Sequence, residues 1–101
     1  MKTKLYDLTL HPVGVSTAEF IRLRDGKTGE LRLAEFRGVK PGEFLAVFDR
    51  NNSGDVILKR VRGVIPCMDD MSMREIHFKQ AQSAVIRCGG RGVYALMAEA
   101  G

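Results

Sequence analysis

The sequence predicts an α+β domain built as a small, mixed, five-stranded β-barrel with two flanking helices. The chain of 101 residues contains 45% hydrophobic and 28% charged residues, which is the range of globular domains. Apolar stretches typical of strands recur along it, and two other stretches have helical spacing. No repeat, linker or low-complexity tract interrupts the chain, so residues 1–101 are expected to form a single domain.

The first two elements are a strand over residues 2–10 and a helix over residues 17–25. Leucines and threonines give the strand a loose alternation, and the segment His11-Pro12-Val13-Gly14 is expected to end it. Ser16 and Glu19 fit a capping box at the start of the helix. The residues expected to turn toward the core from this helix are Phe20, Ile21 and Leu23.

Three strands are expected in the middle of the chain, over residues 30–36, 44–49 and 55–65. Pro41-Gly42 predicts the turn before the second of them. The apolar run of residues 44–48 indicates a strand that is buried on both faces, and Gly63 indicates either a bulge or a close backbone approach in the strand that follows.

The last two elements are a helix and a short strand. Ser72 and Glu75 form a second capping box, so a helix is expected to start near Met73 and to end before Gly89-Gly90. Its final part, residues 84–88, is also consistent with a strand. Residues 93–98 are apolar and predict the closing strand of the barrel.

Composition and charge narrow the classes of function. The net charge is +4 and ten of the sixteen basic residues are arginine, which suits an acidic partner such as RNA. Cys67 and Cys88 lack the spacing of a zinc site, so free thiols are expected, with neither metal nor cofactor. No apolar run is long enough to span a membrane and no signal-peptide core follows Met1, so a cytoplasmic location is expected.

Residues 26–33, Gly-Lys-Thr-Gly-Glu-Leu-Arg-Leu, carry the densest chemistry in the chain. Gly26 fits the left-handed position after a helix, and a strand should start at Glu30. Glu30 and Arg32 then share one face of that strand, because side chains alternate. The segment is not a Walker loop, since it lacks the upstream glycine and follows a helix. It places an ammonium, a hydroxyl, a carboxylate and a guanidinium near one cleft.

Three segments together resemble the ASCH superfamily of PUA-like barrels, in particular its short phage and bacterial members with a Lys-Thr-x-Glu-x-Arg motif. The segments are the opening residues 5–12, the helix and motif over residues 20–32, and the turn over residues 39–43. The resemblance implies a PUA-like barrel with a ligand cleft where the first helix meets the sheet. Glu43 stands at the acidic end of the turn, where the family usually has aspartate.

The first functional hypothesis is the binding of RNA, a nucleotide or a modified nucleoside in this cleft. Lys27 and Arg32 would contact anionic or carbonyl oxygens, Thr28 would make one hydrogen bond, and Glu30 would orient Arg32 or contact a base. The remaining candidate ligand-binding residues are His11, at a strand end close to the expected cleft, and Tyr94, whose ring would stack on a base.

Two alternatives stay open. One is a small hydrolase, either a nucleoside amidohydrolase or a ribonuclease, with Lys27 and Glu30 as catalytic residues. The resemblance supports Lys27, because members that act on acetylated cytidine have a matching lysine, but they have threonine where this chain has Glu30. The other alternative is a non-catalytic scaffold that binds a protein partner through Met68, Met71 and Met73.

Overall fold

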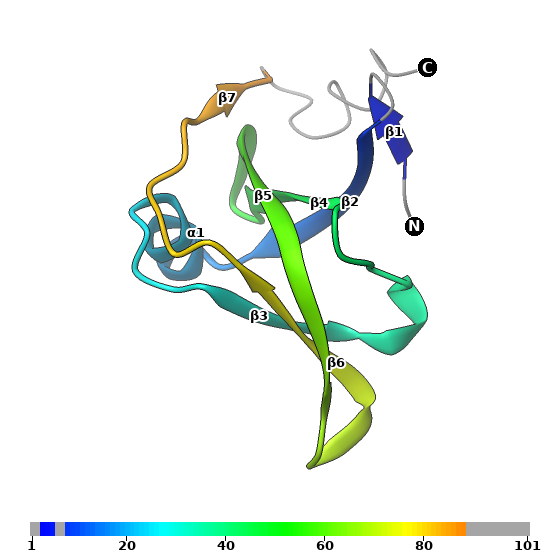
Figure 1. Ribbon diagram of the computed structural model, residues 1–101. Helices are drawn as coiled ribbons and strands as arrows, with labels where there is room; N and C mark the ends of the chain where they lie inside the picture. The colour runs from blue at the N-terminus through cyan, green and yellow to red at the C-terminus, as the bar shows by residue number, and fades with distance from the viewer. Residues whose placement is uncertain (1–2, 6–7, 89–101) are drawn as a thin grey trace.

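The computed structural model describes residues 3–5 and 8–88, and within them it shows a small α+β fold made mostly of strands (Figure 1). The elements in chain order are β1 (Thr3–Leu5), β2 (Leu8–Val15), α1 (Thr17–Arg24), β3 (Glu30–Ala34), the 3₁₀-helix η1 (Glu35–Arg37), β4 (Phe44–Asp49), β5 (Asn52–Cys67), β6 (Asp70–Phe78) and β7 (Ile86–Arg87).

The strands form one mixed sheet with the order β1-β2-β4-β5-β6-β3, and β7 pairs with β5 beside this path. Strands β2 and β4 are parallel, and the other pairs are antiparallel. The parallel pair needs a long crossover, which α1 and β3 supply. Within the described residues the end strands β1 and β3 do not pair with each other, so the sheet is not closed into the expected barrel.

Strand β5 is the long central strand of the sheet. Its first part pairs with β4 and its second part with β6. Figure 1 shows β5 and β6 as a hairpin that extends away from the other elements. The pairing with β6 shifts register between Val61 and Gly63, which confirms the bulge predicted at Gly63. The bulge brings Gly63 opposite His77 on β6.

The core lies on both faces of β4. Leu45 and Val47 belong to the larger cluster, together with Phe20 and Leu23 of α1, whereas Ala46 belongs to a smaller cluster on the opposite face. All three β4 residues are fully buried, which confirms the strand predicted to be buried on both faces.

Helix α1 forms where its caps predict. The Ser16 hydroxyl accepts a hydrogen bond from the Glu19 amide, and Gly26 adopts a left-handed φ of 74° just after the helix. Phe20 and Leu23 are buried as expected, but Ile21 is 40% exposed. Three residues past the turn, β3 begins at Glu30 as predicted.

Two predicted elements are wrong. The single strand predicted over residues 2–10 is two antiparallel strands, β1 and β2, and β2 continues through the segment expected to end it, because β4 pairs with every residue from Leu10 to Val15. The expected second helix is strand β6, followed by an irregular segment and β7. Ser72 does not cap a helix there: its hydroxyl and amide both donate to Asp70 in the hairpin turn.

The predicted last strand, residues 93–98 with Tyr94, lies outside the described residues. Within the part of the chain that the structure describes, no helix has the length and apolar character needed to cross a bilayer.

Candidate functional site

The predicted motif forms one side of a shallow groove of about 400 Å³, which we call the Lys27 groove. Two hydrogen bonds hold its two sides together: the Gly29 carbonyl accepts from the Phe78 amide at 2.9 Å, and the Gln80 side chain donates to the Lys27 carbonyl at 3.2 Å. The lining residues are Lys27, Thr28, Gly29, Glu30, His77, Phe78 and Gln80. Three predicted site residues therefore meet here, namely Lys27, Thr28 and Glu30.

Strands β3 and β6 present a polar face beside this groove. Glu30 lies directly opposite His77, and Arg32 lies opposite Glu75. On the other face Ile76 and Leu33 are buried, and Leu31, between Glu30 and Arg32, is half-buried against the core. The expected alternation of Glu30 and Arg32 is thus confirmed, with two β6 side chains completing the polar face.

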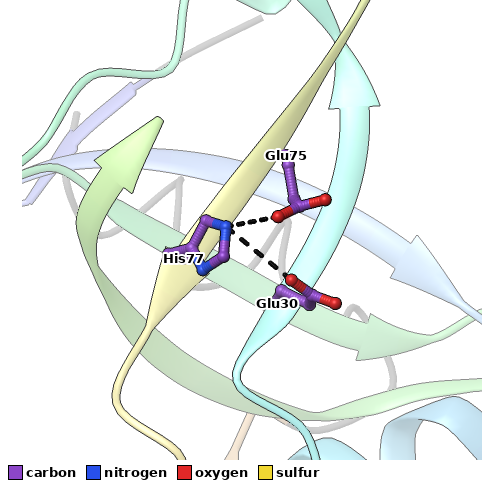
Figure 2. A group of neighbouring side chains, drawn as sticks. All are labelled: Glu30, Glu75 and His77. Carbon is purple, nitrogen blue, oxygen red and sulfur yellow. Dashed lines mark hydrogen bonds and ion pairs between the residues drawn. The ribbon is translucent and has the colours of Figure 1, made fainter. Parts of the chain in front are cut away.

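Glu30, Glu75 and His77 gather at this face, as Figure 2 shows. His77 Nε2 lies 2.6 Å from Glu75 Oε1 and 3.7 Å from Glu30 Oε2. One ligand-type atom from each residue lies within 4.8 Å of the other two. Sequence reasoning missed this cluster because it assigned Glu75 and His77 to a helix, although their spacing of two fits a strand.

Arg32 does not join the Lys27 groove. Its Nη2 donates to Asp69 Oδ1 at 2.5 Å, and its Nε donates to the Cys67 sulfur at 3.4 Å. These hydrogen bonds, to Cys67 and to Asp69, raise the pKa of the Arg32 guanidinium above its ordinary value. The predicted convergence of Arg32 with Lys27 is therefore absent from the structure.

His11 lies on β2 and not in the Lys27 groove. It is fully buried, and its Nε2 lies 2.8 Å from Glu43 Oε1, which also accepts from the Lys40 amide. The contact between His11 and Glu43 therefore connects the turn before β4 to strand β2. Tyr94, the last predicted ligand-binding residue, is outside the described residues.

A second groove of about 250 Å³, which we call the Arg60 groove, shares the segment of residues 79–83 with the Lys27 groove, since Gln80 lines the Lys27 groove and the other four residues line this one. Its lining residues are Leu58, Lys59, Arg60, Arg62, Lys79, Ala81, Gln82 and Ser83. Arg60 and Arg62 also border a neighbouring hollow formed with Pro41 and Gly42. Four of these lining side chains are basic, so this groove is strongly positive.

Residues 79–83 form the wall between the two grooves, and Lys59 anchors it. The Lys59 ammonium donates to the Ala81 carbonyl at 2.8 Å and lies 5.7 Å from the centre of the Phe78 ring. Burial lowers the pKa of Lys59 from its ordinary value, because desolvation disfavours the charged form. The Ser83 amide also donates a hydrogen bond to the Arg24 carbonyl, which connects this segment to the end of α1.

The cysteines and the exposed methionines lie outside the linings of the Lys27 groove and the Arg60 groove. Cys67 is buried and Cys88 is half-buried. Met68 and Met71 are 90% and 62% exposed at the β5–β6 turn. These two methionines do not line the Lys27 groove or the Arg60 groove.

Comparison of the chain with protein-family models, with curated proteins and with solved structures finds no match. The resemblance to the ASCH superfamily therefore stays a prediction from the motif.

Proposed function

We propose that the protein binds RNA through phosphate groups, on the surface that joins the Arg60 groove and the Lys27 groove. One observation carries the proposal. Arg60, Arg62 and Lys79 line one groove, and among the described residues no carboxylate forms an ion pair with any of them. Unpaired arginines gathered in a groove suit the bidentate recognition of phosphate.

The chemistry of the lining favours the RNA backbone over the bases. Among the described lining residues of the two grooves, Phe78 in the Lys27 groove is the one phenylalanine, tyrosine or tryptophan, and it is only 6% exposed. It offers no open ring on which a base could stack. The expected binding is therefore salt-dependent, with little preference for sequence.

The Lys27 groove would supply the second set of contacts. Lys27 is exposed there, and Thr28 and Gln80 present a hydroxyl and an amide along the same hollow. These groups match the phosphate and ribose oxygens of an RNA strand. A strand that crosses residues 79–83 would contact both grooves.

The test is the affinity of a fluorescently labelled single-stranded RNA, measured by anisotropy over a range of salt concentrations. We compare Arg60→Ala/Arg62→Ala with a control, Arg22→Ala/Arg50→Ala, which removes the same charge from exposed positions outside both grooves. If each arginine contacts one phosphate, the first variant lowers the magnitude of the salt slope by about 1.4. The control variant should leave the slope close to that of the wild type.

Two outcomes would reject RNA binding at this surface. One is an equal loss of affinity in the two double variants, which would show only a general effect of net charge. The other is the absence of salt-dependent binding by the folded wild-type protein.

A nucleoside hydrolase is the second candidate, and the position of Glu75 favours it. Glu75 bonds to His77 at the edge of the groove that contains Lys27, so a lysine, a carboxylate and an imidazole lie in one region. Release of acetate from acetylated cytidine, lost in Lys27→Ala and Glu75→Gln, would support turnover. If both variants still release acetate at the rate of the wild type, these residues are not catalytic.

A further inference from the structure

We infer that Glu30, Glu75 and His77 form a binding site for a divalent transition-metal ion. The inference goes beyond the proposed RNA binding and does not depend on it. The three side chains come from two neighbouring strands and point toward one another (Figure 2). Two carboxylates and one imidazole are a donor set that suits Zn²⁺ and its first-row neighbours.

The distances fit one ion with little rearrangement. Metal–ligand bonds of about 2.0–2.1 Å in a tetrahedral site separate neighbouring ligand atoms by about 3.3–3.4 Å. The distance from His77 Nε2 to Glu30 Oε2 is 3.7 Å, and the distance from His77 Nε2 to Glu75 Oε1 is 2.6 Å. Small rotations of the two carboxylates therefore bring all three ligand atoms to binding distance.

The backbone holds the three positions in place. Glu30 on β3 is directly opposite His77 on β6, and Glu75 is the next residue on the same face of β6. Strand β6 pairs with β3 on one side and with β5 on the other, so it is not an edge strand here. The site therefore needs only side-chain motion to bind an ion, which limits the entropy cost of binding.

The charges around the cluster give an independent reason for a cation. Arg32 is the cross-strand neighbour of Glu75, but its guanidinium bonds to Asp69 and Cys67 instead. Glu30 and Glu75 thus share one imidazole, and adjacent like charges on a sheet are unfavourable. A dication would neutralise both carboxylates at once.

The site is exposed enough for an ion to enter and for the bound ion to keep free coordination positions. The side chains of Glu30, Glu75 and His77 are 54%, 37% and 35% exposed. Gly63 on β5 lies opposite His77 and has no side chain to cover the imidazole. A bound ion would keep positions for water or for an oxygen of a ligand in the Lys27 groove, as metal sites with three protein ligands do.

The test uses Zn²⁺ alone, titrated into the full-length protein by calorimetry, with Mg²⁺ as the comparison ion. We expect one Zn²⁺ per chain and much weaker binding of Mg²⁺, because the imidazole nitrogen suits Zn²⁺. His77→Gln, Glu30→Gln and Glu75→Gln should each weaken Zn²⁺ binding at least about tenfold. Glu35→Gln, an exposed glutamate outside the cluster, should bind Zn²⁺ like the wild type.

The sulfur atoms of Cys67 and Cys88 are the competing ligands, and Co²⁺ distinguishes them from the cluster. Co²⁺ bound by oxygen and nitrogen gives visible d–d bands without the strong near-ultraviolet band of a thiolate ligand. A thiolate band, unchanged affinity in His77→Gln, or no saturable Zn²⁺ binding by the folded protein would overturn the inference. RNA binding measured without added metal is a separate readout, so either proposal can fail alone.

Discussion

Arg32 lies directly across the β3–β6 pair from Glu75, yet its guanidinium bonds to Asp69 at 2.5 Å and to the Cys67 sulfur. Both of these partners sit at the far end of the β5–β6 hairpin, where the chain turns. One arginine that the motif places at the ligand cleft is thereby held beside the hairpin turn. Glu75 instead bonds to His77, whose ring nitrogen also faces Glu30.

This arrangement predicts that Arg32 matters less for ligand binding than Lys27. Arg32→Ala should change RNA affinity less than Lys27→Ala does, although both remove one positive charge, because only Lys27 lines the groove. Anisotropy titrations of the two variants at one salt concentration compare them directly. A larger loss in Arg32→Ala would show that the guanidinium leaves Asp69 when RNA binds.

Gly26 should tolerate alanine worse than Gly38, although both have a left-handed φ, 74° and 65°. A side chain at Gly38 meets no atom within 4 Å, so Gly38→Ala should cost about 1–2 kcal/mol for the left-handed conformation alone. A Cβ at Gly26 would lie 2.7 Å from the backbone of Ala81, so Gly26→Ala should cost more.

Urea denaturation of the two glycine variants measures this difference. The backbone at Ala81 belongs to the wall between the grooves, so Gly26→Ala should also weaken RNA binding whereas Gly38→Ala should not. Equal losses of stability would mean that residues 79–83 do not pack on Gly26.

The two capping boxes of the sequence should behave differently when their serines are replaced. Ser16 caps α1 through the Glu19 amide, so Ser16→Ala should lower the free energy of unfolding by about 1 kcal/mol. The Ser72 hydroxyl donates to Asp70 at the exposed start of β6, so Ser72→Ala should have a smaller effect. Thermal or urea unfolding checks both, and a larger effect at Ser72 would contradict the strand assignment of β6.

Lys59 should make stability depend on pH in the alkaline range. Its pKa is lowered by burial, so between that lowered value and its ordinary value of 10.5 the folded protein holds fewer protons than the unfolded chain. The contribution of Lys59 to stability therefore rises with pH through this window. At pH values below this window Lys59 is charged in both the folded and the unfolded state, so the cost of burying its charge lowers the stability of the folded protein in full.

Lys59→Met removes this titration, so the stability of the wild type relative to Lys59→Met should increase from neutral pH toward about pH 10.5. Urea midpoints measured at several pH values give the difference. Lys79→Met, at an exposed lysine, is the matched control and should run parallel to the wild type. A Lys59→Met difference that stays constant with pH would show that the ammonium is not desolvated.

The sequence by itself determined the elements whose signals are local. The caps at Ser16 and Gly26 mark the ends of α1, and the Pro41-Gly42 turn and the apolar run of β4 appear where they are predicted. The alternation of Glu30 and Arg32 with leucines also follows from β3 alone. In each case neighbours in the chain, or the period of the strand, fix the conformation.

Only the tertiary structure decided the identity of β6 and the composition of the site. Residues 70–78 carry a capping box, but pairing with both β3 and β5 satisfies their backbone hydrogen bonds as a strand. That non-local pairing brings His77 opposite Glu30 and Gly63, and it turns Glu75 onto the same face. Because contacts between distant segments set these positions, spacing along the chain does not reveal them.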